Sequence, residues 1–251
     1  MNIAKPPHPA APPAHTASRQ LIARHSLTVR ITHWVNVLCL SILLMSGLQI
    51  FNAHPRLYWG KYGADADPAV IAVNTLPGWL TIPSYHDLGA GRNWHFLFAW
   101  LLVINGLLYL AHGLWRGHIR RDLLPNRDQQ RLRHLWREVR DHARLRFPKG
   151  DEARRYNALQ KASYLLGALV LIPLMVLTGL TMSPAMDAGF PVLLDLFGGR
   201  ASARTLHFIT ASLLVLFVVV HVLMVVLSGF WNNLRSMING RYAIDRSEHT
   251  S

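Results

Sequence analysis

Four long apolar stretches without Asp, Glu, Lys or Arg constrain this chain most strongly. Each is long enough to cross the roughly 30 Å hydrocarbon core of a bilayer, which takes about 20 helical residues. All 26 basic and 13 acidic residues lie outside them. We therefore predict an all-α integral membrane protein, a four-helix bundle over residues 25–235 of the 251. The predicted spans are residues 31–51, 94–115, 162–182 and 206–230.

The charges between the spans predict the orientation of the bundle. Segment 116–161 carries 14 basic and 6 acidic residues, whereas segments 52–93 and 183–205 are balanced. Because basic loops remain in the cytoplasm, segment 116–161 and both termini are predicted to be cytoplasmic. A basic cytoplasmic face explains the net charge of +13. We therefore expect no nucleic-acid partner.

The segments outside the spans are predicted to be tails and one surface helix. Residues 1–24 are rich in Pro and Ala and are expected to form a disordered cytoplasmic tail, and residues 236–251 a second cytoplasmic tail. In loop 116–161, apolar residues recur at helical spacing among arginines: Leu132, Leu135, Trp136, Val139 and Ala143. This pattern is typical of a basic amphipathic helix on an anionic membrane surface.

Histidines inside the spans are the candidate functional residues, because ionisable groups in a bilayer are costly and usually mark a site. The last span holds His207 and His221, which are 14 residues apart on nearly the same helix face and so roughly 21 Å apart along the axis. Depth in the membrane pairs His207 with His95 near the outer surface and His221 with His33 near the inner surface. Such pairs suit axial ligation of two haems, while hydrogen bonds between helices are the alternative.

Arginines support the haem interpretation. Arg30, Arg92 and Arg204 each precede a span histidine by three residues, so each shares a helix face with that histidine one turn nearer the membrane surface. Arginine binds carboxylates well, and a haem carries two propionates. We therefore expect these three arginines to contact propionates, although a basic residue at the end of a span is also an ordinary membrane anchor.

Two further polar residues lie in the inner halves of the first two spans. Asn36 is one turn from His33, and His112 reaches the same depth from the second span. Both could donate a hydrogen bond to a quinone carbonyl beside the inner haem. Alternatively, they bond only across helices, and His112 could replace His33 as the inner ligand.

These motifs resemble the bacterial cytochrome b561 and hydrogenase-type cytochrome b membrane subunits. The shared phrases are RITHWVN from Arg30, RNWHF from Arg92, YNALQKASYL from Tyr156 and PLMVLTGLTMSP from Pro173. The third-span phrase resembles the cytochrome b subunits of thiosulfate reductase. The resemblance implies two haems b on His33, His95, His207 and His221, a quinone or quinol site, and a place in the bacterial inner membrane. It also implies a periplasmic oxidoreductase partner of the molybdopterin or hydrogenase type.

The expected function is therefore a di-haem electron-transfer subunit between the quinone pool and a periplasmic oxidoreductase. Bis-histidine ligation leaves no open position on iron, which suits electron transfer better than chemistry at the metal. One alternative is a stand-alone quinone-reducing cytochrome that takes electrons from superoxide or another small donor. Another is a non-redox, histidine-lined transporter, which the absence of Asp and Glu from every span disfavours.

Overall fold

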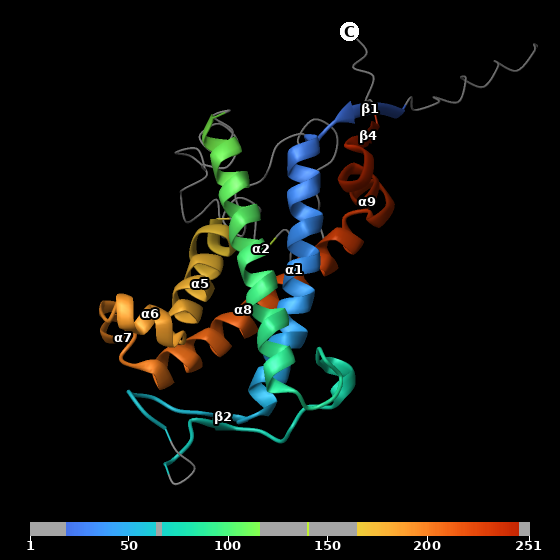
Figure 1. Cartoon of the computed structure of the whole chain (residues 1–251). Coiled ribbons are helices and arrows are strands. Elements are labelled where there is room, and N and C mark those ends of the chain that lie inside the picture. The colour runs from blue at the N-terminus through green and yellow to red at the C-terminus, as the bar shows by residue number, and fades with distance from the viewer. Residues whose placement is uncertain (1–18, 64–66, 116–139, 141–164, 246–251) are drawn as a thin grey trace, which may run out of the picture.

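The computed structural model describes residues 19–63, 67–115, 140 and 165–245. Its framework is three long apolar helices, α1 (Leu27–Asn52), α2 (Leu88–Trp115) and α8 (Arg200–Leu227), each long and apolar enough to cross a membrane. Helices α1 and α2 lie side by side, and α8 passes behind them (Figure 1). Three of the four predicted spans are thus found as single helices, with shifts of up to six residues at their ends.

Burial in these helices is inverted relative to a water-soluble protein. Leucine and valine side chains of α8 face outward, with Leu216 and Val219 58% and 57% exposed, whereas Thr205 is 0% exposed. Hydroxyl groups are tolerated inside because they donate to carbonyls within their own helix, as Thr210 Oγ1 does to Leu206 at 2.8 Å. An apolar exterior over helices of this length fits a bilayer as the surrounding medium.

The third predicted span, residues 162–182, is not one regular helix in its described part. Its described part is a six-residue π-helical turn, η4 (Leu166–Leu171), followed by the ten-residue helix α5 (Ile172–Thr181). Pro173 has no N–H and crowds the carbonyl four residues earlier, and a wider turn before the proline relieves this conflict. The described part packs against α8. Residues 162–164 lie outside the described part.

The end of the bundle at the bottom of Figure 1 is closed by the long loop between α1 and α2. This loop holds the short pair β2 (Arg56–Leu57) and β3 (Ile71–Ala72) and the 3-10 turn η1 (Gly78–Leu80). Helices α6 (Pro184–Gly189) and α7 (Val192–Leu196) precede α8. The loop is fixed to the start of α8, because Thr205 Oγ1 donates to the Tyr58 carbonyl at 2.7 Å and Ser202 Oγ accepts from the Gly60 N–H at 2.7 Å. We call this the β2–β3 end.

The opposite end carries both ends of the described chain. Strand β1 (Arg19–Ala23) pairs antiparallel with β4 (Arg241–Asp245), and α9 (Phe230–Asn239) connects α8 to β4. Gly229, at φ 112°, separates α8 from α9, since a backbone in the left-handed region ends an α-helix. We call this the β1–β4 end.

One prediction about the tails is corrected here. Residues 19–23 were expected to be disordered and instead form β1. Residues 236–245, predicted to belong to a cytoplasmic tail, complete α9 and form β4. Each strand gains its hydrogen bonds from the other, more than 200 residues away, so neither segment signals a strand locally. The described part of the chain is accordingly mostly helical, with two small sheets. The predicted amphipathic helix of loop 116–161 lies outside the described residues except for Arg140, which is helical.

Candidate haem-ligand site

The structure brings four of the five span histidines together as the two predicted pairs. The ring centroids of His95 and His207 lie 6.2 Å apart near the β2–β3 end. Those of His33 and His221 lie 6.3 Å apart toward the β1–β4 end. Each pair joins two different helices, α2 with α8 and α1 with α8, and α8 contributes one histidine to each.

The spacing within both pairs suits two imidazoles on opposite sides of one metal ion. A metal–imidazole bond is about 2 Å long and the ligating nitrogen lies about 1 Å from the ring centre, so two such rings hold their centroids about 6 Å apart. This is too far for a direct hydrogen bond between the rings and matches the observed 6.2 and 6.3 Å. The histidines therefore fit a haem iron, which needs two axial ligands from the protein.

In the His95–His207 pair, the Nδ1 atom of each histidine forms a hydrogen bond with a hydroxyl group. Ser46 Oγ lies 3.1 Å from His95 Nδ1, and Thr178 Oγ1 lies 3.0 Å from His207 Nδ1. Each hydroxyl donates its single proton to a carbonyl of its own helix, Ser46 to Ile42 and Thr178 to Leu174, both at 2.7 Å. The hydroxyl oxygens must therefore accept from Nδ1–H, which leaves Nε2 of both neutral rings with a free lone pair for a metal.

A glycine follows each of these hydroxyl residues and lets the imidazole approach the helix. A Cβ atom added at Gly47 would lie 3.4 Å from His95 Cε1, and one added at Gly179 would lie 3.4 Å from His207 Cε1. Any side chain larger than a methyl group would have to displace the ring. The pairs Ser46-Gly47 and Thr178-Gly179 thus fix the position of the two rings as well as their tautomer.

The sequence carries a signal for this arrangement that our prediction missed. The tripeptide Ser46-Gly47-Leu48 on α1 recurs as Thr178-Gly179-Leu180 on α5, and RNWHF at residues 92–96 recurs as RTLHF at 204–208. In both halves of the chain, the first phrase packs on the histidine of the second. Reading the two halves as a repeat would have pointed to Ser46 and Thr178.

The His33–His221 pair is supported differently. The Phe217 ring stacks on His221 at 6.2 Å between centroids with an interplanar angle of 11°, one helical turn away on α8. A Cβ added at Gly167, inside the π-helical turn, would lie 3.4 Å from Phe217 Cζ. The π-helical turn therefore packs against Phe217, and Phe217 packs against the His221 ring.

The three arginines predicted to bind propionates each contact different residues. Arg204 donates to the His54 carbonyl at 2.6 Å and lies over the Phe51 ring at 5.9 Å, while Arg92 lies over the Phe96 ring at 5.7 Å. Arg30 points to the end of α9 and donates to the Ile238 carbonyl. Since a guanidinium has five N–H donors, one carbonyl partner leaves the others for a carboxylate.

Asn36 and His112 are not members of the two histidine pairs. Asn105 Nδ2 donates to Asn36 Oδ1 at 2.7 Å and to the Thr32 carbonyl at 2.9 Å, so a buried amide contact joins α2 to α1. Asn105, which our prediction did not include, is 6% exposed. This contact corresponds to the alternative in which Asn36 bonds only across helices. His112 belongs to neither histidine pair.

Comparison with known proteins agrees with this geometry. A family model described as prokaryotic cytochrome b561 matches residues 24–240. The chain belongs to the prokaryotic cytochrome b561 family. One relative of this cytochrome, from Azospira oryzae, is named "putative protein-methionine-sulfoxide reductase subunit YedZ1". It is 36% identical over 224 residues, which cover 89% of this chain and 99% of the relative.

Membership confirms the predicted family and gives the histidine pairs their context. The cytochrome is a haem-binding, multi-pass membrane protein of electron transfer. The non-redox transporter has no support in this family. Of the residues described, the two facing histidine pairs are the arrangement that fits a haem b best, with Ser46 and Thr178 fixing the tautomers of one pair.

Proposed function

We propose that this cytochrome carries two haems b and passes electrons between the quinone pool and a periplasmic oxidoreductase. The observation that carries the proposal is the pair of histidine sites, His95–His207 and His33–His221, toward opposite ends of one bundle. Because His207 and His221 are 14 residues apart on α8, the sites are separated by roughly 21 Å along that helix. Two sites so placed divide the membrane crossing into shorter electron-transfer steps.

The protein would hold the cofactors and tune them rather than perform chemistry at iron. A haem b supplies one-electron exchange between ferric and ferrous iron, and two histidines occupy both axial positions. Ser46 and Thr178 would increase the electron donation of their imidazoles by accepting from Nδ1–H. Arg92 and Arg204 stand one turn from the His95–His207 pair and would bind propionates there.

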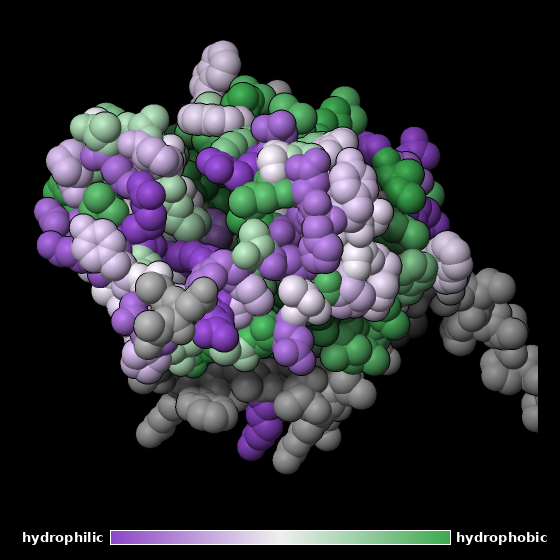
Figure 2. All heavy atoms as spheres, turned by 60° about the horizontal axis from the view of Figure 1, so that its bottom comes forward, coloured by the Kyte–Doolittle hydropathy of each residue, from purple (hydrophilic) through white to green (hydrophobic). Residues whose placement is uncertain are grey.

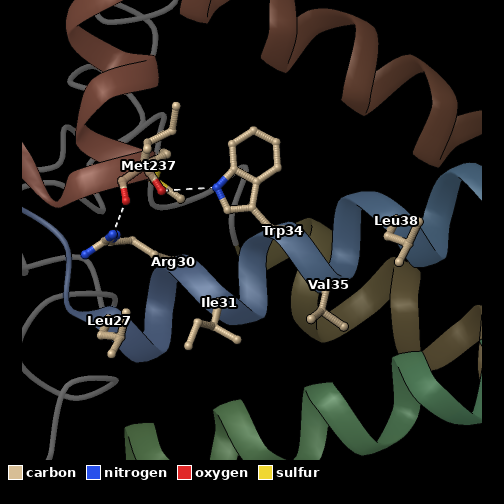
Figure 3. A pocket seen from close by; sticks show the side chains of 8 residues that line it. Leu27, Arg30, Ile31, Trp34, Val35, Leu38 and Met237 are labelled. Atoms are coloured by element: carbon tan, nitrogen blue, oxygen red, sulfur yellow. Dashed lines mark hydrogen bonds between the residues drawn. The ribbon is translucent and has the colours of Figure 1, made fainter.

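We place the β1–β4 end in the cytoplasm, on the basis of the basic loop 116–161, and the β2–β3 end in the periplasm. The quinone site then belongs to a groove of about 400 Å³ between α1 and α9 in the cytoplasmic half (Figure 3). The lining residues are Leu27, Arg30, Ile31, Trp34, Val35, Leu38, Met237 and Ile238.

Two residues of this groove, Trp34 and Arg30, suit a quinone site better than Asn36 and His112 do. The ring of Trp34 lies 5.5 Å from the His33 ring, so the groove reaches a haem-ligand residue. Arg30 Nε is buried without an acceptor in the described part of the chain and could donate to a quinone carbonyl. Asn36 Oδ1, by contrast, already accepts from Asn105. In this placement, Arg30 binds the quinone and not a propionate.

A variant pair on α1 tests the quinone site. Val35→Trp should fill the groove and slow reduction of the haems by added quinol about tenfold or more. Val37→Trp is the matched control, because Val37 is exposed on another face of the same helix and does not line the groove. Equal rates in the two variants, or a quinone bound beside the His95–His207 pair, would refute this site.

The periplasmic partner is proposed to be an oxidoreductase that acts on methionine sulfoxide. The support is the name of the Azospira oryzae relative, which describes a subunit of such an enzyme. The rival is a stand-alone cytochrome that takes electrons from superoxide at the β2–β3 end. Reduction of the haems by superoxide at the same rate with and without a partner would favour the rival.

The decisive experiment is a redox difference spectrum of the purified protein with a haem-to-protein ratio. We expect two low-spin haems b per chain that titrate at two potentials. A ratio of one haem per chain would mean that one histidine pair does not have its proposed role. A protein without haem would refute the proposal.

A further inference from the structure

A positively charged pocket at the β2–β3 end joins Arg204 to polar residues that have no role in the function proposed so far. It encloses about 260 Å³, and its polar walls are Tyr58, Lys61 and Tyr62 from the loop and Arg200 and Arg204 from α8. None of the described lining residues is acidic, although Arg200 forms an ion pair with Asp187 outside the lining. Figure 2, which turns this end of the molecule forward, shows hydrophilic residues gathered across it. Because Arg200 is paired with Asp187, Lys61 and Arg204 supply the net positive charge of the pocket, and this charge favours an anionic ligand.

Tyr58 gives the pocket a buried donor without an acceptor. The residue is 5% exposed, and no described atom pairs with its phenol oxygen. A buried hydroxyl without a partner costs about 1–3 kcal/mol, and buried tyrosines usually find a partner. The unpaired phenol therefore points to a ligand that accepts a hydrogen bond inside the pocket.

The chain holds this phenol in place. The Tyr58 ring stacks on the His54 ring at 5.7 Å between centroids. Its backbone carbonyl accepts from Thr205 Oγ1 at 2.7 Å, which joins it to the residue that follows Arg204. Tyr58 and Arg204 thus present an O–H and an N–H donor to the same pocket.

The pocket lies on the surface side of the His207 site. Arg204 and Arg200 precede His207 by three and seven residues, so they stand roughly 4.5 and 10 Å nearer the β2–β3 end of α8, close to the face that carries His207. A carboxylate extending from a group bound at His207 toward this end would meet these side chains. The chemistry that fits is an ionised carboxylate with one O–H and one or more guanidinium donors.

We propose that Tyr58 and Arg204 together bind a propionate carboxylate of the haem held by His95 and His207. This inference rests on the proposed di-haem function. It adds a residue from the α1–α2 loop to a site otherwise made by helices. The loop then has a direct contact with the cofactor, and Tyr58 is a positioning residue that also adjusts the potential of that haem.

The test is a redox titration of each haem in purified Tyr58→Phe protein at pH 8. The phenol withdraws negative charge from the propionate, so its loss should favour ferric iron. The equilibrium constant for reduction of the His95–His207 haem should fall about threefold, which is a drop of about 30 mV for one electron. The other haem should not change.

Tyr62→Phe is the matched control, because Tyr62 lines the same pocket but is 87% exposed, with its phenol available to water. Arg204→Gln should shift the same haem in the same direction, and the double variant should shift it by less than the sum, since both side chains act on one carboxylate. Equal potentials in wild type, Tyr58→Phe and Tyr62→Phe, with both haems bound, would overturn this inference alone.

Reconstitution with haem dimethyl ester identifies the source of the carboxylate. If the acceptor is a propionate, the ester should abolish the difference between wild type and Tyr58→Phe. If the difference persists, the acceptor of the Tyr58 hydrogen bond is not a propionate, and the inference is wrong. A wild-type protein that binds no haem at the His95–His207 pair would instead defeat the proposed function.

Discussion

Thr178 Oγ1 lies 3.0 Å from Nδ1 of His207, and its own proton is committed to the Leu174 carbonyl at 2.7 Å. This relationship fixes which ring nitrogen of His207 faces the proposed iron, and Ser46 and His95 repeat it in the other half of the chain. A single hydroxyl proton, already used within its own helix, thereby determines the tautomer of a histidine on another helix.

Thr178→Val should raise the midpoint potential of the His95–His207 haem by a few tens of millivolts. Loss of the acceptor weakens electron donation by His207 and disfavours ferric iron, and a hydrogen bond of about 1 kcal/mol corresponds to roughly 40 mV for one electron. Thr181→Val is the control, because Thr181 is equally buried on α5 and its described hydrogen bond goes to the Leu177 carbonyl. A redox titration of both variants makes the comparison, and identical potentials would rule out this tuning role.

Gly47→Val and Gly179→Val should each lower occupancy of the same haem several-fold. A Cβ at either position already lies 3.4 Å from an imidazole carbon, and a branched side chain must push the ring from its place. Gly106→Val is the control, because a Cβ there has no neighbour within 4 Å. Haem content per chain, measured by absorbance, is the readout. Full occupancy in Gly179→Val would mean that the ring can move without losing its ligand role.

His207→Ala should remove one haem and leave the other spectroscopically intact, and His221→Ala should remove the complementary one. Each pair depends on a single α8 histidine, and the two pairs lie near opposite ends of the bundle. His112→Ala should retain both haems, since His112 is in neither pair. Loss of a haem in His112→Ala with both retained in His33→Ala would reverse the assignment at the β1–β4 end.

Asn105→Leu should destabilise the bundle by about 1–3 kcal/mol, because it leaves the half-buried Asn36 amide without its partner. The double variant Asn36→Leu, Asn105→Leu should lose less than the sum of the two single variants, since removing both partners leaves no unpaired amide. Thermal unfolding in detergent, followed by loss of the haem spectrum, measures this coupling. Additive losses would show that the two amides act independently.

The sequence by itself determined the helical membrane class, three of the four predicted spans to within six residues, and which span histidines lie opposite one another. An apolar stretch of about 20 residues without charge predicts a membrane helix. A helix of that length crosses the hydrocarbon core, and it satisfies its backbone hydrogen bonds internally. Once the spans are placed, the order of entry from each side fixes which histidines share a depth. This reasoning pairs His95 with His207 and His33 with His221, and the structure has the same pairs.

Only the tertiary structure decided what surrounds these histidines. The β1–β4 pairing, the Asn36–Asn105 contact and the approach of Tyr58 to Arg204 each join residues from 69 to more than 200 positions apart. Periodicity reports how one helix presents its faces, but it does not say which neighbour meets a given face or how the helix is rotated against it. Hydrogen bonds to Nδ1 depend on that rotation to within an ångström. The repeat in the sequence can therefore single out Ser46 and Thr178, but only the packed helices show that their hydroxyl groups contact the histidine rings.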